Sequence, residues 1–239
     1  HKSIAWLHTA KIHYDNSMVK AFDSYSNELQ PKLLTNIKKH FATDTFPIQT
    51  VLLDNVLPIL NFSLRTTRKH LTRRVGDVLV NASTGSGKTL GYTIPIIQML
   101  SKRTVNRLRV LIILPTKLLI NQVYETINKL SQGTALIISM SKMEYSLKEE
   151  HKKFLQNEPD VLIITPGRLV DHLNMNSISL RNLTMLVLDE ADHLLNQSFQ
   201  NWCPELMNRI RSEKVDQMPG NVIKMVFSAT LTTNTEKLH

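Results

Sequence analysis

The sequence predicts an α/β domain in which a mostly parallel sheet carries helices on both faces. From Asp77 onward, short runs rich in β-branched residues alternate with segments whose apolar residues have helical spacing. Continuous apolar runs of this length are typical of strands that are buried on both faces, as in a parallel sheet. Strand alternating with helix implies crossover connections over a doubly wound sheet. The length of 239 residues is enough for one large domain of this kind.

The expected elements follow one another in a regular order. An amphipathic helix is expected at Pro31–His40, and a second apolar segment runs from Gln49 to Leu60. The expected strands are Val78–Val80, Val110–Ile113, Leu136–Ile138, Val161–Ile164, Leu186–Leu188 and Val222–Phe227. Helical spacing appears at Leu118–Ile127 and again at Phe199–Ile210. Ligands of such sheets bind beyond the carboxyl ends of the strands, and every motif described below falls at one of those ends.

Composition narrows the class of protein. Lys and Arg outnumber Asp and Glu by 29 to 20, a net charge of +9. This surplus favours a polyanionic partner, although it could also serve only to keep the protein soluble. The single cysteine, Cys203, excludes an internal disulfide framework and fits a reducing compartment. We expect no membrane span, because no apolar run of about 18 residues occurs, and no secretory signal. The absence of an initiator Met at His1 indicates an excised fragment.

The first chemical motif is a phosphate-binding loop at Ala82–Thr89, directly after an expected strand. Its predicted nucleotide-binding residues are Ser83, Thr84, Gly85, Ser86, Gly87, Lys88 and Thr89. Glycines let the backbone curl so that successive N–H groups point at phosphate oxygens. Lys88 would reach the β- and γ-phosphates, and the Thr89 hydroxyl would bind Mg²⁺. A small-residue turn is the alternative, which the flanking strand, the helix and Gly-Lys-Thr oppose.

The second motif is Asp189-Glu190-Ala191-Asp192, which follows another expected strand. In enzymes with a phosphate-binding loop, an acid at the end of a neighbouring strand holds Mg²⁺, usually through water. Asp189 fits that role, and Glu190 could orient and deprotonate an attacking water. An acidic helix N-terminus is the alternative explanation. The position of the motif about a hundred residues after the loop favours the catalytic interpretation.

These motifs resemble those of DEAD-box helicases. The matches to motifs I, II and III stand in the order of the family, at Ala82–Thr89, Asp189–Asp192 and Ser228–Thr230. Gln49 resembles the glutamine of the Q motif, and Phe22 resembles the aromatic residue upstream of it. Motif Ia is similar to Pro115–Leu119, and motif Ib matches Thr165–Leu169. The resemblance covers roughly Phe22 to Leu231. It implies an N-terminal extension at 1–20, a first RecA-like domain at 21–231, and at 232–239 the start of a linker to a second RecA-like domain.

The resemblance also implies roles for the nucleotide-side residues. Gln49 would read the adenine edge with its amide, and Phe22 would cover the adenine face, unless it is an ordinary core aromatic. Asp192, Ser228 and Thr230 would couple the nucleotide state to domain closure; for the last two, a polar strand end is the alternative.

Two loops would hold the backbone of RNA. The implied RNA-binding residues are Pro115, Thr116 and Lys117 in the first loop and Thr165, Pro166, Gly167 and Arg168 in the second. Contacts confined to the backbone would make binding insensitive to sequence and sensitive to salt. Arg168 could instead be a solvated cation at a helix start.

The sequence departs from the family pattern in several places. Motif Ia has Lys117-Leu118 where Arg-Glu is usual, and Ser139–Lys142 replaces a double glycine. Residues 61–75 contain five basic residues without an apolar stripe and are interpreted as an exposed, mobile insertion in the domain. With Ser198–Trp202, the insertion resembles the nucleolar group that acts in large ribosomal subunit assembly. It could bind ribosomal RNA or an assembly factor, or be a solvated loop.

The resemblance implies an ATP-dependent RNA helicase that uses ATP and Mg²⁺, with Lys88, Asp189 and Glu190 as its catalytic residues. It also implies that the protein acts in the nucleus and nucleolus, with pre-ribosomal RNA as its partner. Without the arginines of the second domain, this chain alone is expected to be nearly inactive. A non-catalytic RNA-binding scaffold with a structural nucleotide is the main alternative. A P-loop nucleotide kinase is a further one, which Ser228–Thr230 argues against.

Overall fold

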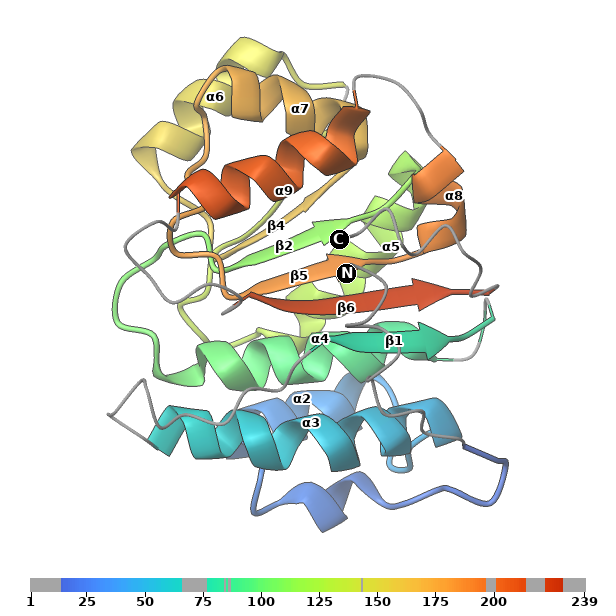
Figure 1. Ribbon diagram of the computed structural model, residues 1–239. Helices are drawn as coiled ribbons and strands as arrows, with labels where there is room; N and C mark the ends of the chain where they lie inside the picture. Colours follow the sequence, from blue (N-terminus) through green and yellow to red (C-terminus); the bar gives the residue numbers. More distant parts are fainter. Residues whose placement is uncertain are drawn as a thin grey trace.

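The computed structural model describes residues 14–65, 77–83, 85, 87–142, 144–196, 201–213 and 222–229. A six-stranded sheet runs through the centre in the order β1-β6-β5-β2-β4-β3 (Figure 1). Its strands are β1 (Val78–Asn81), β2 (Val110–Ile113), β3 (Ile138–Met140), β4 (Val161–Ile164), β5 (Met185–Leu188) and β6 (Ile223–Ser228). Every neighbouring pair is parallel, which confirms the predicted parallel sheet.

Helices cover both faces of this sheet, as predicted (Figure 1). The α-helices are α2 (Pro31–His40), α3 (Pro47–Arg65), α4 (Lys88–Met99), α5 (Lys117–Leu130), α6 (Leu147–Gln156), α7 (Pro166–Asn174), α8 (Ala191–Asn196) and α9 (Trp202–Glu213), and two 3-10 helices are η1 (Phe22–Tyr25) and η3 (Leu100–Lys102). One core contains residues of η1 and α2 to α5, and the other contains residues of α6 to α9. None of the described helices combines the length and the apolar character that a membrane crossing needs.

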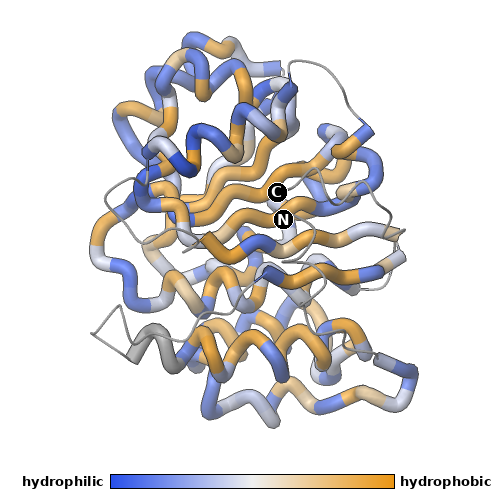
Figure 2. The backbone as a smooth tube through the Cα atoms, in the orientation of Figure 1, coloured by the Kyte–Doolittle hydropathy of each residue, from blue (hydrophilic) through white to orange (hydrophobic). Residues whose placement is uncertain are grey.

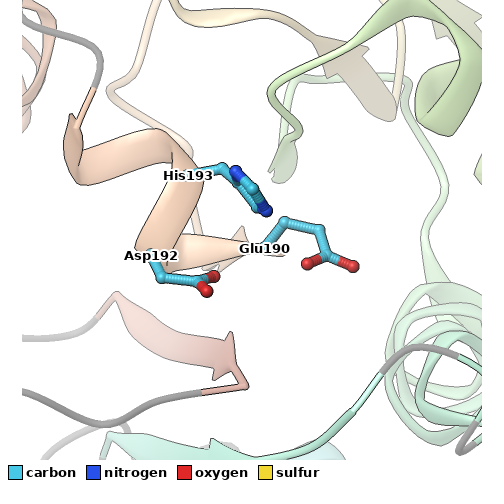
Figure 3. A group of neighbouring side chains, drawn as sticks. All are labelled: Glu190, Asp192 and His193. Atoms are coloured by element: carbon cyan, nitrogen blue, oxygen red, sulfur yellow. The ribbon is translucent and has the colours of Figure 1, made fainter.

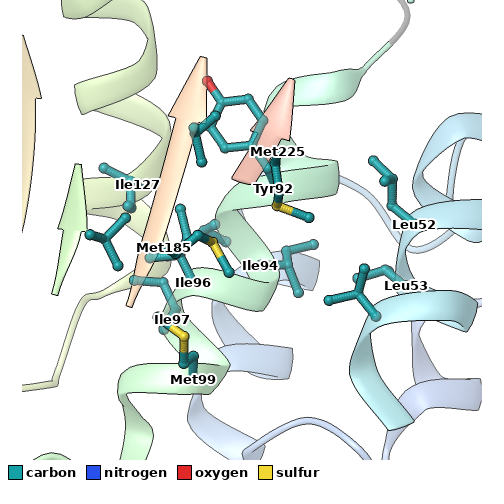
Figure 4. Packing of buried hydrophobic residues seen from close by; sticks show 14 of the residues in the cluster. Leu52, Leu53, Tyr92, Ile94, Ile96, Ile97, Met99, Ile127, Met185 and Met225 are labelled. Atoms are coloured by element: carbon teal, nitrogen blue, oxygen red, sulfur yellow. The ribbon is translucent and has the colours of Figure 1, made fainter. Parts of the chain in front are cut away.

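The strand sequences build both cores at once. Val110 and Ile112 belong to the first core, whereas Leu111 and Ile113 belong to the second. Side chains of a strand point alternately to opposite faces, so a continuous apolar run supplies both cores. Figure 2 shows the result as a hydrophobic sheet between helices with hydrophilic outer faces. In the first core, α4 lies between the sheet and α3, and Ile94 is completely buried there with Leu53 (Figure 4).

Several element boundaries differ from the sequence prediction. The third strand begins at Ile138, two residues after the expected Leu136. The last helix is described from Trp202, and Phe199, where its helical spacing is expected to start, lies outside the described residues. The predicted insertion does not begin at residue 61. Helix α3 continues through Arg65, and Asn61 is buried, with its side chain donating to the Glu28 carbonyl oxygen at 2.9 Å and its Oδ1 accepting from Gln98 at 3.2 Å. Residues 66–75 of the predicted insertion lie outside the described residues.

Candidate nucleotide and RNA site

The phosphate-binding loop connects β1 to α4 at the carboxyl edge of the sheet. Gly85 and Gly87 both have φ of 83°, the left-handed conformation that glycine adopts without strain. Gly87 is the N-cap of α4, and a Cβ there would collide with the Phe46 ring and lie 2.8 Å from Gln49 Nε2. The strand, the tight turn and the following helix are therefore arranged as the motif predicts. Ser83 is exposed, whereas Thr84 and Ser86 lie outside the described residues.

Lys88 joins this loop to the acidic motif. Its side chain is 8% exposed, and its Nζ lies 2.9 Å from Asp189 Oδ1 and 2.8 Å from Glu190 Oε1. Burial alone would lower the pKa of Lys88, but the two carboxylates outweigh it, so that the pKa is raised and the ammonium stays charged. The two motifs lie about a hundred positions apart in sequence and meet at one buried cation. This contact confirms that they form a single site.

The acidic motif is held in a strained backbone conformation. Glu190 has φ of 55°, a conformation that costs free energy in a residue other than glycine and that clusters at functional sites. Its N–H donates to Asp189 Oδ1 at 2.9 Å. Asp189 is 2% exposed and Glu190 is 8% exposed. The loop between β5 and α8 thus fixes both carboxylates beside Lys88.

Tyr92 is a residue of this site that the sequence interpretation missed. Its hydroxyl donates to Asp189 Oδ2 at 2.9 Å, and its ring packs 5.1 Å from that of Phe227. Burial, followed by the charge of Asp189, raises the pKa of Tyr92 well above its usual value, so the hydroxyl keeps its proton. Helical spacing could have revealed the residue, because Tyr92 lies four positions after Lys88 and therefore on the same face of α4.

The oxygen atoms near the acidic motif fit a magnesium ion. Carboxylate and hydroxyl oxygens are the ligands that Mg²⁺ prefers, and Asp189, Thr89 and Asp192 supply them. Asp192 Oδ1 is buried without a hydrogen-bond partner, which is the state expected of an oxygen that awaits a cation or a donor. Within the described residues, Glu190, Asp192 and His193 also place one ligand atom each within 4.8 Å of one another (Figure 3). The imidazole of His193 is not a ligand that Mg²⁺ prefers.

Gln49 contacts the phosphate-binding loop directly. Its Oε1 accepts from the Phe46 N–H at 2.9 Å, and its Nε2 donates to the Gly87 carbonyl oxygen at 3.0 Å. A carboxamide has two N–H groups and two lone pairs, so one of each is not used by these two bonds, although the residue is only 3% exposed. Gln49 thus lies against the phosphate-binding loop, and its reading of adenine stays a prediction.

Phe22 does not face this site. Its ring is completely buried in the first core, and the expectation that it covers an adenine face is wrong for this conformation. The alternative, an ordinary core aromatic, is what the structure shows. The exposed aromatic beside Gly87 is instead Phe46, which is 52% exposed. One position in a sequence does not reveal which of two nearby aromatics the fold buries.

The third motif is tied to the phosphate-binding loop through the backbone. Strands β1 and β6 are neighbours, Asn81 is in register with Ser228, and the Ala82 N–H donates to the Ser228 carbonyl oxygen at 2.9 Å. Ser228 is 2% exposed. Thr230 lies outside the described residues, so the predicted coupling of Asp192, Ser228 and Thr230 stays a prediction.

The two loops expected to bind RNA both lie at the carboxyl edge of the sheet. Thr116 caps α5, and its hydroxyl accepts from the Leu119 N–H at 3.3 Å. The Lys117 side chain is half-exposed and forms an ion pair with Glu144. Pro115 precedes that cap, and Thr165, Pro166 and Gly167 form the start of α7, with Thr165 as its N-cap. Both loops are helix starts, where N–H groups can meet phosphates, but only the first is exposed at Thr116 and Lys117, whereas Thr165 and Gly167 are half-buried and Pro166 is buried.

Arg168 is neither a free phosphate-binding cation nor a solvated one, and both expectations for it are wrong. It is 6% exposed, its Nε donates to Glu150 Oε1 at 3.1 Å, and its Nη2 donates to the Tyr145 carbonyl oxygen at 2.6 Å. Glu150 also accepts from Ser141 Oγ at 2.6 Å and from the Lys142 N–H at 2.9 Å. Arg168 thus anchors the segment between β3 and α6. Nothing in the sequence near Glu150 predicts this contact, because only the tertiary fold brings α6 to α7.

The fold and the site define a nucleotide-binding domain with a phosphate-binding loop, and comparison with known proteins shows its family. The family described as "DEAD/DEAH box helicase" matches residues 65–238, so the chain belongs to the DEAD/DEAH box helicases. This confirms the resemblance drawn from the sequence motifs.

Relatives with a common name are highly similar to the chain. The "ATP-dependent RNA helicase DBP6" of Vanderwaltozyma polyspora is 70% identical over 239 residues, which are 100% of this chain and 38% of that protein. Proteins of the same name from Saccharomyces cerevisiae and Candida albicans are 65% identical over 100% of this chain and 44% identical over 99% of it. The chain spans 38% of the length of each of these relatives.

Solved structures show the same fold. The yeast DEAD-box splicing factor Prp28 matches with a TM-score of 0.76 at 23% identity, over 95% of this chain and 50% of that one. A DEAD box protein from the hyperthermophile Methanococcus jannaschii matches with a TM-score of 0.67 at 26% identity, over 85% of this chain and 49% of that one. The expected RecA-like domain is confirmed.

Proposed function

We propose that this chain is the ATP-binding domain of an ATP-dependent RNA helicase. The contact of Lys88 with Asp189 and Glu190 carries the proposal, because it brings a phosphate-binding lysine and two carboxylates together beside a helix N-terminus. The names of the relatives support the same activity. The share of those relatives that the chain leaves uncovered accommodates the second RecA-like domain.

In this proposal, Lys88 changes partners when ATP binds. Its ammonium now neutralises two carboxylates, and it would instead hold the β- and γ-phosphates, to which the N–H groups of the loop also point. Thr89 and Asp189 would hold Mg²⁺, which supplies positive charge to the phosphates when it is bound. Once Lys88 moves away, the Glu190 carboxylate becomes available to orient a water for attack on the γ-phosphate. Gln49 would present its remaining amide groups to adenine.

The proposed RNA runs along the carboxyl edge of the sheet, over the starts of α5 and α7. Backbone N–H groups and the Thr116 and Lys117 side chains would contact phosphates, so binding would weaken with salt. The net charge of +9 supports a polyanionic partner. Arg168 contributes by holding the neighbouring segment in place.

The finer proposal is a role in the assembly of the large ribosomal subunit, in the nucleolus, with pre-ribosomal RNA and assembly factors as partners. It is supported by the resemblance of residues 61–75 and 198–202 to that group, of which 66–75 and 198–200 lie outside the described residues. Crosslinking the full-length protein to RNA in cells and sequencing that RNA tests it. Enrichment of pre-ribosomal RNA is expected, whereas messenger RNA alone would contradict the proposal.

Turnover measurements on the full-length protein test the activity itself. The wild type is expected to hydrolyse ATP faster when RNA is present. Glu190→Gln should still bind ATP and RNA but should stall hydrolysis, because an amide cannot accept the proton of the attacking water. A wild type that binds both ligands but never hydrolyses ATP would instead support the RNA-binding scaffold. Normal turnover by Glu190→Gln would reject the role of Glu190.

A further inference from the structure

The segment between β3 and α6 contacts both of the loops over which RNA is proposed to run. Glu144 forms an ion pair with Lys117 at the start of α5, and the Tyr145 carbonyl oxygen accepts from Arg168 at the start of α7. The family pattern places a double glycine after this strand, whereas this chain has Ser139–Lys142 followed closely by Tyr145. Tyr145 therefore lies just after the stretch that replaces the double glycine.

Tyr145 is exposed although its backbone is anchored. The residue is 50% exposed, and Lys142 Nζ lies 5.7 Å from the centroid of its ring. Leu118, at the start of α5, is 67% exposed. Arg168, by contrast, is buried against Glu150. At this edge the exposed surface thus offers an aromatic ring that has a cation over one face.

The ring stands on a preorganised segment. Glu150 accepts from Ser141 Oγ and the Lys142 N–H, and Arg168 holds the Tyr145 carbonyl oxygen at 2.6 Å. The first two bonds hold Ser141 and Lys142, and the third holds Tyr145 through its backbone carbonyl oxygen. A preordered platform loses little conformational entropy when it binds a ligand, and a tyrosine has only two side-chain torsions to fix.

We propose that Tyr145 stacks on an unpaired base of the bound RNA. Exposed aromatic rings next to cations are the usual platforms for single-stranded nucleic acid, and stacking tolerates any base because every base has a π-face. The net charge of +9 and the adjoining Lys142 favour RNA over an apolar protein partner. The inference rests on the proposed function and deepens it, because it adds a base contact to a surface otherwise expected to touch only the backbone.

Binding of the full-length protein to a fluorescent ten-nucleotide oligouridine, with Mg²⁺ and a non-hydrolysable ATP analogue, tests the inference. Tyr145→Ala should weaken binding roughly tenfold, because stacking on one base contributes about that much. Tyr145→Phe should bind within about twofold of the wild type, since it keeps the ring. Leu155→Ala is the matched control, because Leu155 is a 60% exposed apolar residue near the other end of α6. It should have no effect.

Salt dependence and abasic RNA separate stacking from charge. Tyr145→Ala should leave the slope of log affinity against log salt unchanged, whereas Lys142→Ala should reduce it. With an abasic site at the contacted nucleotide, the wild type and Tyr145→Ala should bind equally. Equal binding of the two proteins to intact oligouridine would overturn the inference alone. A wild-type protein that binds no RNA would overturn the proposed function, and the inference with it.

Discussion

Replacing Glu150 with Gln tests the buried network that holds the RNA edge together. The carboxylate accepts from Ser141, the Lys142 N–H, Arg168 and His172, and its side chain is 5% exposed. Gln has almost the same shape but no charge, and its NH₂ group would face one of these donors. Arg168, which is also buried, would then lose its ion pair with this carboxylate. Breaking a buried ion pair in this way typically costs about 3–5 kcal/mol.

The assay is thermal unfolding of the chain, followed by circular dichroism. For a domain of 150–250 residues, 1 kcal/mol corresponds to about 2–4 °C, so Glu150→Gln should lower the Tm by roughly 6–20 °C. Glu149→Gln is the matched control, because Glu149 is the preceding residue of α6 and is exposed. A Glu150→Gln protein that unfolds within about a degree of this control, or about 0.3–0.5 kcal/mol, would refute the network as described.

The pH dependence of the same variant follows from the pKa of Glu150. Burial would raise that pKa, but the hydrogen bond from His172 and those from the other donors outweigh burial, so the folded-state pKa is lowered. A group with a lowered pKa stabilises the fold above its unfolded-state value and loses this contribution as pH falls through the folded-state value. The difference in Tm between the wild type and Glu150→Gln should therefore be largest near pH 7 and should shrink as the pH falls below about 4.5. A difference that grows in acid would contradict the assignment.

Three further predictions concern single residues. Phe22→Ala should destabilise the fold by about 3–5 kcal/mol, because the ring is fully buried, whereas Phe46→Ala should cost much less in the same unfolding assay; equal effects would contradict the burial of Phe22. Tyr92→Phe keeps the packing but removes the donor to Asp189, so ATP turnover of the full-length protein should need more Mg²⁺ for half-maximal rate, and an unchanged Mg²⁺ dependence would remove Tyr92 from the site. Burial raises the pKa of Cys203 to about 11, so at pH 8 the native thiol should react with a disulfide reagent roughly a hundredfold more slowly than the unfolded one; equal rates would show that it is accessible.

Local sequence patterns predicted the parallel sheet and the nucleotide site well. Apolar runs such as Val161–Ile164 mark strands buried on both faces, and parallel strands bring all their carboxyl ends to one edge. The meeting of Lys88 with Asp189 follows from that geometry once each motif is placed after its strand. These features depend on periodicity and chain order, which a sequence contains.

Side-chain partners chosen by the tertiary fold were not predictable in the same way. Arg168 stands at a helix start, a position that predicts a solvent-facing cation, yet α6 places Glu150 in contact with it. Phe22 and Phe46 are chemically alike, and only packing decides that the first is buried and the second exposed. The basic residues that follow Asn61 indicate an exposed loop beginning at that residue. In the structure, Asn61 is instead fixed by hydrogen bonds to Glu28 and Gln98.

Lys88 links the phosphate-binding loop to the acidic motif, and in the proposed function its ammonium binds the phosphates once ATP is present. Equilibrium titration of the full-length protein with Mg-ATP tests it most directly, with Lys88→Ala compared with the wild type after both are shown to be folded. The wild type should bind Mg-ATP saturably, and Lys88→Ala should lose at least about tenfold in affinity, since roughly 1.4 kcal/mol of phosphate contact is a low bound for a buried charge. Equal affinity of the two proteins for Mg-ATP would show that Lys88 does not bind the phosphates.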